Sequence, residues 1–202
     1  MNVMRYGPHA VTQGSITGAQ VDALMSGQRA SILYSDPPWG DSYLKMFATH
    51  TQKATGVRPV QPAYTELCAR YADLITKYVD EWVMIEVGVR ALDPMLEAVR
   101  PLLAACEVLP TVYGDGLSAV IIVGRKSPGP LPQYDLSNLK GLSFVKRLLE
   151  PVAEPGATVL DPCCGAGYTA KAAVHHGMIF RGNELNPARL EKTQKFLASV
   201  TG

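Results

Sequence analysis

The tetrapeptide Asp36-Pro37-Pro38-Trp39 combines the residue types that can hold a planar amine for reaction. An amino group conjugated to an aromatic ring is a poor nucleophile, so its N–H bonds must be oriented and its ring held still before it can be alkylated. The Asp36 carboxylate and the Pro37 carbonyl can accept the two N–H bonds. Trp39 offers a face on which a base can stack, a contact worth ~1–3 kcal/mol. The two prolines fix φ and restrict the local backbone.

The same four residues also have an ordinary structural interpretation. They follow an apolar run near 31–35 that predicts a buried strand. Asp-Pro-Pro can simply end such a strand, because proline interrupts the pairing and aspartate caps a turn. Both interpretations remain open on the tetrapeptide alone.

A second motif starts with an apolar strand at 158–160, continues into two glycines and leads to a helical stretch at 170–174. Glycines let the backbone approach a ligand closely, and the N–H groups that begin the helix face the same crevice. The third glycine of the dinucleotide fingerprint is missing, so S-adenosylmethionine fits this motif better than NAD. The predicted cofactor-binding residues of the motif are Asp161, Pro162, Cys163, Cys164, Gly165, Ala166, Gly167, Tyr168 and Thr169.

The next predicted strand, at 178–184, ends in an acidic residue, Glu184. In nucleoside-binding α/β folds an acid in this place can accept hydrogen bonds from ribose hydroxyls. The second half of the chain therefore has the features of a nucleoside-cofactor site. The predicted cofactor set is completed by Gln13, Ser35, Asn183 and Leu185.

The two motifs resemble those of the S-adenosylmethionine-dependent DNA amino-methyltransferases, which modify adenine N6 or cytosine N4. The Asp-Pro-Pro-Trp motif comes first and the cofactor motif follows, which is the permuted order of the β class in that family. Residues 10–16 look like the strand and glycine turn that precede its catalytic strand, and 140–150 look like its helix before the cofactor strand. The resemblance implies that Asp36, Pro37, Pro38 and Trp39 are catalytic. It also implies that residues 165–167 cradle the methionine part of the cofactor.

Two features depart from the family pattern. Cys163 stands where the family usually has phenylalanine, so the wall beside the cofactor is smaller and softer. The larger DNA-reading insert between the two halves is missing. With few residues left to contact base edges, we expect short or relaxed sequence specificity.

Length and composition are those of one globular domain. The 202 residues permit a substantial core, and 47% hydrophobic with 18% charged residues is typical of a soluble protein. No apolar stretch reaches the ~18 residues that a membrane span needs, and the N-terminus lacks the apolar core of a secretory signal. The sequence therefore predicts a cytoplasmic protein. The four cysteines lack a Cys-x-x-Cys spacing, which favours structural thiols and predicts no metal.

A net charge of +1 says little about nucleic acid, but the charges are unevenly distributed. No acidic residue occurs from 42 to 65, whereas Lys45, Lys53 and Arg58 follow the catalytic motif closely. This segment, which we expect to be a long loop, could lie along a phosphate backbone. It could equally be a polar loop that carries these charges by chance.

The remaining pattern predicts a circularly permuted, doubly wound α/β fold in which seven strands form a mainly parallel sheet, as in Rossmann-like class I methyltransferases. Helices are expected at 18–25, 64–79 and 93–105, the last with Asp93 as N-cap and Pro94 at its first position. Two strands around Gly114-Asp115-Gly116 predict an antiparallel hairpin at 107–124. We expect one domain over 1–202, with a catalytic half at 1–125, a proline-rich connector and a cofactor half at 138–202.

The favoured function is S-adenosylmethionine-dependent methylation of an exocyclic base amine, with adenine N6 in DNA as the target and extrusion of the base from its stack. Methylation of RNA, of cytosine N4 or of a protein amide remains an alternative, as does a phage-type enzyme that adds a larger group. A non-catalytic nucleotide-binding partner subunit is a further alternative. A homodimer or a partner subunit could supply target recognition.

Overall fold

One eight-stranded sheet organises the chain in the computed structural model, which describes residues 2–114 and 116–202. The strand order is β1-β2-β8-β7-β3-β4-β6-β5. The strands from β2 to β4 in this order are parallel, while β1, β6 and β5 each pair antiparallel with a neighbour. The strands are β1 (Val3–Tyr6), β2 (His9–Gln13), β3 (Ala30–Ser35), β4 (Val79–Gly88), β5 (Ala105–Tyr113), β6 (Leu117–Arg125), β7 (Thr158–Asp161) and β8 (Ile179–Glu184).

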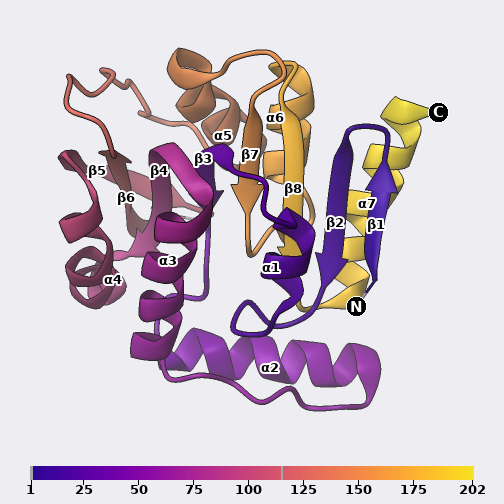
Figure 1. Ribbon diagram of the computed structural model, residues 1–202. Coiled ribbons are helices and arrows are strands. Elements are labelled where there is room, and N and C mark those ends of the chain that lie inside the picture. Colours follow the sequence, from indigo (N-terminus) through magenta and orange to yellow (C-terminus); the bar gives the residue numbers. More distant parts are fainter. Residues whose placement is uncertain (1, 115) are drawn as a thin grey trace.

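Helices cover both faces of the sheet (Figure 1). Helices α1, α3 and α4 pack on one face and α5, α6 and α7 on the other, each face with its own cluster of buried apolar side chains. Helix α2 lies across the bottom of the view in Figure 1, beneath the ends of the parallel strands. The helices are α1 (Gln20–Met25), α2 (Asp41–Thr55), α3 (Tyr64–Tyr78), α4 (Leu92–Val99), α5 (Gly141–Leu149), α6 (Tyr168–His175) and α7 (Pro187–Thr201).

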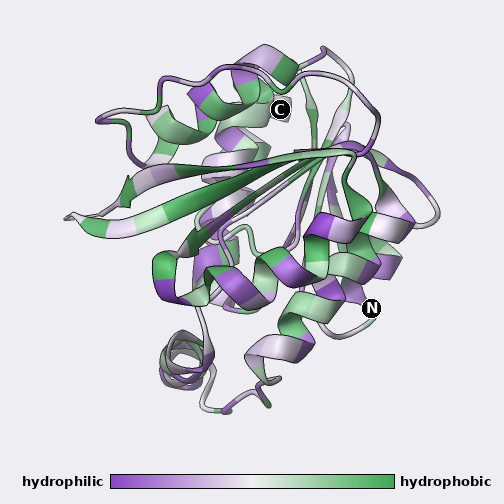
Figure 2. Cartoon of the chain, turned by 90° about the vertical axis from the view of Figure 1, so that its left-hand side faces the viewer, coloured by the Kyte–Doolittle hydropathy of each residue, from purple (hydrophilic) through white to green (hydrophobic). Residues whose placement is uncertain are grey.

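The predicted mainly parallel, doubly wound α/β fold is confirmed. Its central strands are apolar on both sides, because helices cover both faces of a parallel sheet. Residues Ile32 and Leu33 of β3 and Val159 and Leu160 of β7 are fully buried. Figure 2 shows this apolar character as green along the strands between the helical layers.

Three details of the expected architecture are wrong. The sheet has an eighth strand, the short edge strand β1. The chain turns at Gly7 after β1, so that β1 pairs antiparallel with β2. The expected long loop at 40–63 contains a 15-residue helix, α2. The expected helix at 93–105 begins at Leu92, so Asp93 lies inside its first turn and is not the N-cap.

The end of that last helix also differs from the expectation. Regular α4 stops at Val99 because Pro101 lacks the N–H that a continuing helix needs, and a short 3-10 turn at 100–102 leads to β5. The predicted hairpin is present as β5 and β6, in register from Ala105 opposite Arg125 to Tyr113 opposite Leu117. Asp115, which we included in its turn, lies outside the described residues.

Parallel strands present their carboxyl ends along one edge of the sheet, and both sequence motifs lie there. Asp36 follows β3, Pro162 follows β7, and Glu184 closes β8. Gly14 follows β2 on the same edge, and its N–H donates to the carbonyl of Glu184 at 3.0 Å. Among the described residues no helix is both long and apolar enough to cross a lipid bilayer.

Candidate active site

A cleft opens at this carboxyl edge, with about 640 Å³ of space that is partly open to solvent. Its floor consists of the segments that follow β2, β3, β7 and β8, and its roof consists of α2 with the start of α3. Seven of the predicted site residues line it: Asp36, Pro38, Pro162, Cys163, Asn183, Glu184 and Leu185. The structure therefore brings both sequence motifs to one cavity.

The other predicted residues do not line this cleft. Some are buried next to it, such as Ser35, Asp161 and Thr169, and Tyr168 projects to solvent with 52% of its surface exposed. The predicted residues outside the cleft wall are Gln13, Ser35, Pro37, Trp39, Asp161, Cys164, Gly165, Ala166, Gly167, Tyr168 and Thr169. Their assignment to cofactor or substrate remains a prediction.

Sequence reasoning missed the roof of the cleft. Leu44, Phe47 and Thr51 point into it from successive turns of α2. The guanidinium of Arg189, at the start of α7, lies 4.8 Å from the ring centre of Phe47 and joins the roof to the floor by a cation–π contact. The 3.6-residue spacing of the three α2 side chains was a usable signal, but glycines and prolines on both sides of the helix concealed it.

Asp161 fixes the loop that follows β7. One of its carboxylate oxygens accepts a hydrogen bond from the backbone N–H of Cys163 at 3.0 Å and from the hydroxyl of Ser35 at 3.2 Å. The other accepts from the hydroxyl of Thr169 at 2.5 Å. Burial raises the pKa of Asp161 to about 7, although these hydrogen bonds act in the opposite direction. Asp161 thus shapes the glycine loop from beneath.

Glu184 joins two loops at the floor of the cleft. Its carboxylate accepts hydrogen bonds from the backbone N–H of Gly165 and from that of Asn186, both at 2.8 Å. Burial raises its pKa above the ordinary value, while these bonds and the charge of Arg189 oppose the rise. Glu184 is only 8% exposed but lines the cleft, and its carboxylate can accept more hydrogen bonds than the two it receives from these N–H groups.

Asn183 precedes Glu184 and is almost fully buried in the same wall. Its side-chain amide donates to the carbonyls of Gly14 at 3.0 Å and of Pro162 at 3.1 Å, which ties the loops after β2 and β7 together. The side-chain oxygen of Asn183 has no hydrogen-bond partner among the described residues. A buried acceptor without a partner is costly, and a ligand donor in the cleft would relieve that cost.

Asp36 lines the cleft and lies beside Trp39. The indole Nε1 of Trp39 donates to the Asp36 carboxylate at 3.0 Å. Burial raises the pKa of Asp36 to about 6, and hydrogen bonds from Tyr113 and Trp39 and the charge of Arg189 limit the rise. At neutral pH Asp36 is therefore mainly ionised and can accept hydrogen bonds.

Trp39 is more enclosed than a free stacking plate would be, with 9% of its surface exposed. Its ring lies 4.8 Å from that of Tyr113 in an edge-to-face arrangement and 5.7 Å from that of Tyr43. A Cβ on Gly88 would come within 2.7 Å of the indole, so only glycine at the end of β4 leaves room for Trp39. The structure therefore gives Trp39 a role in orienting Asp36, and its stacking role remains a prediction.

Glu86 is a buried acid that sequence reasoning did not identify. It lies on β4 beside β3, where Tyr34 pairs with Met84 and Ser35 with Ile85. Its only recorded side-chain partners among the described residues are the hydroxyls of Tyr34 and Thr111, both at a long 3.5 Å. Burial raises the pKa of Glu86 to about 8, and the negative charge of Asp36 adds to the rise. Glu86 thus remains mostly protonated at neutral pH.

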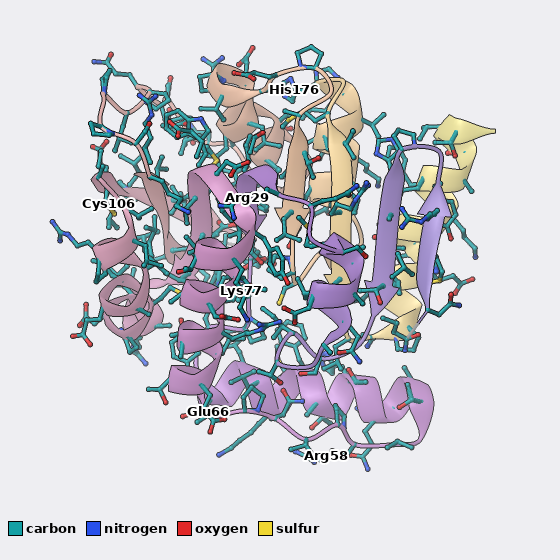
Figure 3. The ribbon with its side chains drawn as sticks, in the orientation of Figure 1. Arg29, Arg58, Glu66, Lys77, Cys106 and His176 are labelled. Atoms are coloured by element: carbon teal, nitrogen blue, oxygen red, sulfur yellow. The ribbon has the colours of Figure 1, made fainter. Side chains whose placement is uncertain are left out.

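The three predicted nucleic-acid contacts are exposed but do not line the cleft. Lys45 and Lys53 are exposed residues of α2. Arg58 follows that helix and lies at the lower end of the molecule in Figure 3. His176, labelled at the opposite end of the same view, has its ring nitrogen 3.0 Å from the carbonyl of Lys146.

Within the described ranges, no cluster of three or more histidine, cysteine or acidic residues is arranged to hold a metal ion.

Three solved structures with the same architecture are described as DNA methyltransferases or as a putative DNA modification methylase. The chain is similar to M1.HpyAVI, with a TM-score of 0.64, 16% identity and coverage of 93% of this chain and 97% of that one. A putative DNA modification methylase from Thermus thermophilus gives a TM-score of 0.63, 18% identity and 96% coverage of both chains. The cytosine-N4-specific PvuII DNA methyltransferase gives 0.60 and 13% identity, covering 96% of this chain and 89% of that one.

At these identities the likeness establishes the fold, which is that of the class I methyltransferases. No protein-family model matches the sequence. No curated protein matches it either.

The protonation of Glu86 predicts how stability depends on pH. In the unfolded chain this carboxyl loses its proton near pH 4.5, whereas in the folded protein it keeps it to about pH 8. Its contribution is therefore fully present below pH 4.5 and is lost as the pH rises to 8. The unfolding free energy of the wild type should therefore fall between pH 5 and 8. In Glu86→Gln we expect this fall to be smaller by about 1–3 kcal/mol, measured by urea denaturation.

Glu107→Gln is the matched control, because Glu107 is an exposed glutamate on the neighbouring β5. It should leave the pH dependence of the wild type unchanged. A Glu86→Gln curve parallel to that of the wild type would show that Glu86 is ionised in the folded protein at neutral pH.

Proposed function

We propose that this protein transfers the methyl group of S-adenosylmethionine to an exocyclic amine of a nucleobase, with adenine N6 in DNA as the target. The observation that carries the proposal is the placement of Asp36 at one end of the cleft whose floor holds Glu184. The Asp36 carboxylate can accept hydrogen bonds from an amine, and the Glu184 carboxylate can accept them from a ribose diol. A nucleoside cofactor and an amine acceptor can therefore meet in the same cavity.

The cleft and the glycine loop beside it have features that fit such a cofactor. Gly165 has φ of +52°, and a Cβ built on it would find only the Arg189 side chain, at 4.0 Å, so the backbone there faces open space. The unpartnered oxygen of Asn183 offers a further acceptor in the wall. Glu184 and Asn183 would hold the polar groups of the nucleoside, and Cys163 leaves more room beside it than a phenylalanine would.

The cofactor would supply a methyl group on a positively charged sulfur, and the residues at the edge would prepare the amine. An ionised Asp36 accepts one N–H bond and favours the positive charge that develops on nitrogen during alkylation. The carbonyl of Pro38 is already used by the N–H of Gly40 at 3.2 Å, whereas no hydrogen bond to the Pro37 carbonyl occurs within the described part of the chain. Pro37 can therefore accept the second N–H. The proposed catalysis is mainly positioning.

The known structures support methylation of DNA from S-adenosylmethionine and leave the choice of base open. M1.HpyAVI and the Thermus thermophilus methylase have each been solved in complex with S-adenosylmethionine. The PvuII enzyme acts on cytosine N4, which keeps that amine as the second candidate. Adenine is favoured because Asp36-Pro37-Pro38-Trp39 resembles the motif of amino-methyltransferases that act chiefly on adenine N6.

The function is tested by incubating the purified protein with isotope-labelled S-adenosylmethionine and either DNA or RNA. The nucleosides are then separated and analysed by mass spectrometry. The proposal predicts labelled N6-methyldeoxyadenosine from DNA. Labelled N4-methyldeoxycytidine, or label only in RNA or in protein, would contradict the adenine assignment, and label in none of them would contradict methyl transfer altogether.

Removing the acid at the end of β8 should weaken cofactor binding. A carboxylate that accepts hydrogen bonds from a diol contributes roughly 1.5–3 kcal/mol, so Glu184→Ala should raise the dissociation constant for S-adenosylmethionine about 10- to 100-fold in calorimetry. Glu191→Ala serves as control, because Glu191 is an exposed residue of α7 paired with Lys195. Unchanged affinity in a folded Glu184→Ala protein would place the ribose elsewhere.

Removing the Asp36 carboxylate should slow methyl transfer and leave cofactor binding largely unchanged. Asp36→Asn is expected to lower methyl transfer by at least about 100-fold, the lower range for a positioned group that acts on the reacting atoms, while cofactor affinity changes little. In the wild type the rate should fall as the pH drops through about 6, because protonated Asp36 no longer offers a charged acceptor. Activity of Asp36→Asn within threefold of the wild type would remove Asp36 from the reaction.

A further inference from the structure

Two exposed tyrosines and two lysines form a continuous surface that leads away from Asp36. We call Tyr113, Lys140, Tyr168 and Lys171 the tyrosine–lysine track. Tyr113 is 43% exposed at the end of β5 and Tyr168 is 52% exposed at the start of α6. Single exposed apolar side chains need no explanation, but exposed aromatic rings that gather in one patch are a feature of interaction sites.

Contacts link the members of the track one after another. The ring of Tyr113 lies 4.8 Å from that of Trp39, and the ammonium of Lys140 donates to the carbonyl of the adjacent Gly114. The chain continues to Gly141, where a Cβ would lie 3.4 Å from the ring of Tyr168. The ammonium of Lys171 lies 5.9 Å from the centre of that ring.

The track is separate from the proposed cofactor site. The cleft is lined by segments after β2, β3, β7 and β8 and by α2, α3 and α7, whereas the track consists of the β5–β6 hairpin and the starts of α5 and α6. Figure 1 shows α5 and α6 behind the sheet and α2 below it. The two surfaces meet at Asp36, which lines the cleft and accepts a hydrogen bond from Tyr113.

The two lysines of the track contact a backbone carbonyl and aromatic rings: Lys140 donates to Gly114, and the ammonium of Lys171 lies 5.9 Å from the ring centre of Tyr168 and 5.8 Å from that of Phe196. In the described ranges neither Lys140 nor Lys171 forms an ion pair with a carboxylate. Two positive charges that alternate with two aromatic faces are the arrangement by which proteins bind unpaired nucleic acid: the cations follow the phosphates, and the rings stack on the bases. Stacking tolerates any base, because every base has a π-face.

We infer that the tyrosine–lysine track binds the unpaired strand that flanks the target base, so that this strand crosses the α5–α6 side of the sheet edge while the cofactor occupies the α2 side. The inference rests on the proposed function, because it supplies the substrate of the same site. It also gives the chain a way to hold nucleic acid without reading its sequence.

The test measures binding of a fluorescent, adenine-free single strand, such as a 12-residue oligothymidylate, by anisotropy and without cofactor. Loss of one stacked base corresponds to about a 5- to 150-fold weaker affinity, which we expect for Tyr168→Ala. Tyr168→Phe keeps the ring and should bind within about twofold of the wild type. Because Tyr168 projects to solvent, neither substitution should disturb the fold.

The lysines are tested through the salt dependence of binding. The double variant Lys140→Ala/Lys171→Ala should reduce the slope of log affinity against log salt by about 1.4, from roughly 0.7 for each phosphate contact on a single strand. The control is Lys192→Ala/Lys195→Ala, which removes the same charge from α7. It should leave the slope unchanged.

Failure of the track and failure of the proposed function give different results. If the wild type methylates DNA but Tyr168→Ala and the double-lysine variant bind as tightly as the wild type, the track is refuted and the function stands. If these variants lose affinity as predicted although no methylated nucleoside forms, the track is supported and the function is refuted. No measurable binding of single strands by the wild type would overturn the track.

Discussion

The burial of four carboxyl groups along one edge of the sheet is the constraint on which the site depends. Asp36, Glu86, Asp161 and Glu184 occur at or near the carboxyl ends of β3, β4, β7 and β8. A buried carboxyl is tolerated only when donors satisfy it or when it keeps its proton. Burial raises the pKa of all four, and the hydrogen bonds that each receives decide its state.

The four carboxyls have different roles at this edge of the sheet, which depend on their hydrogen-bond partners. Asp161 is surrounded by protein donors and shapes the glycine loop. Glu86 has only two long hydrogen bonds and remains protonated, which limits the negative charge beside Asp36. Asp36 and Glu184 line the cleft and keep lone pairs for ligands. The positions proposed to bind ligands are thus those where the fold leaves a buried acceptor with free lone pairs.

The sequence predicted the floor of the site well, because parallel strands bring their carboxyl ends together whatever lies between them in the chain. Asp36 and Glu184 could be placed in one crevice for that reason alone. The roof was missed because Gly40, Gly56 and Pro62 punctuate the segment around α2, and such residues usually mark loops.

For other positions the local sequence contains too little information to predict where the side chain lies. Glu86 is a single acid within an apolar strand, and only the register with β3 places it beside Asp36. Tyr168 follows the glycine motif directly in sequence, which suggested the cofactor. In the structure Tyr168 lies over Gly141 at the start of α6 and is half exposed to solvent, and its assignment to the cofactor remains a prediction. Side-chain direction at a helix start depends on packing, which a motif does not encode.

The central claim is that one cleft holds a nucleoside cofactor at Glu184 and an amine at Asp36. The most direct measurement is a crystal structure of the protein with S-adenosylhomocysteine and adenosine. The account predicts that the cofactor's ribose hydroxyls contact Glu184 and that the exocyclic amine of the second adenine lies within hydrogen-bond distance of Asp36. A cofactor bound outside the cleft, or an amine held away from Asp36, would contradict it.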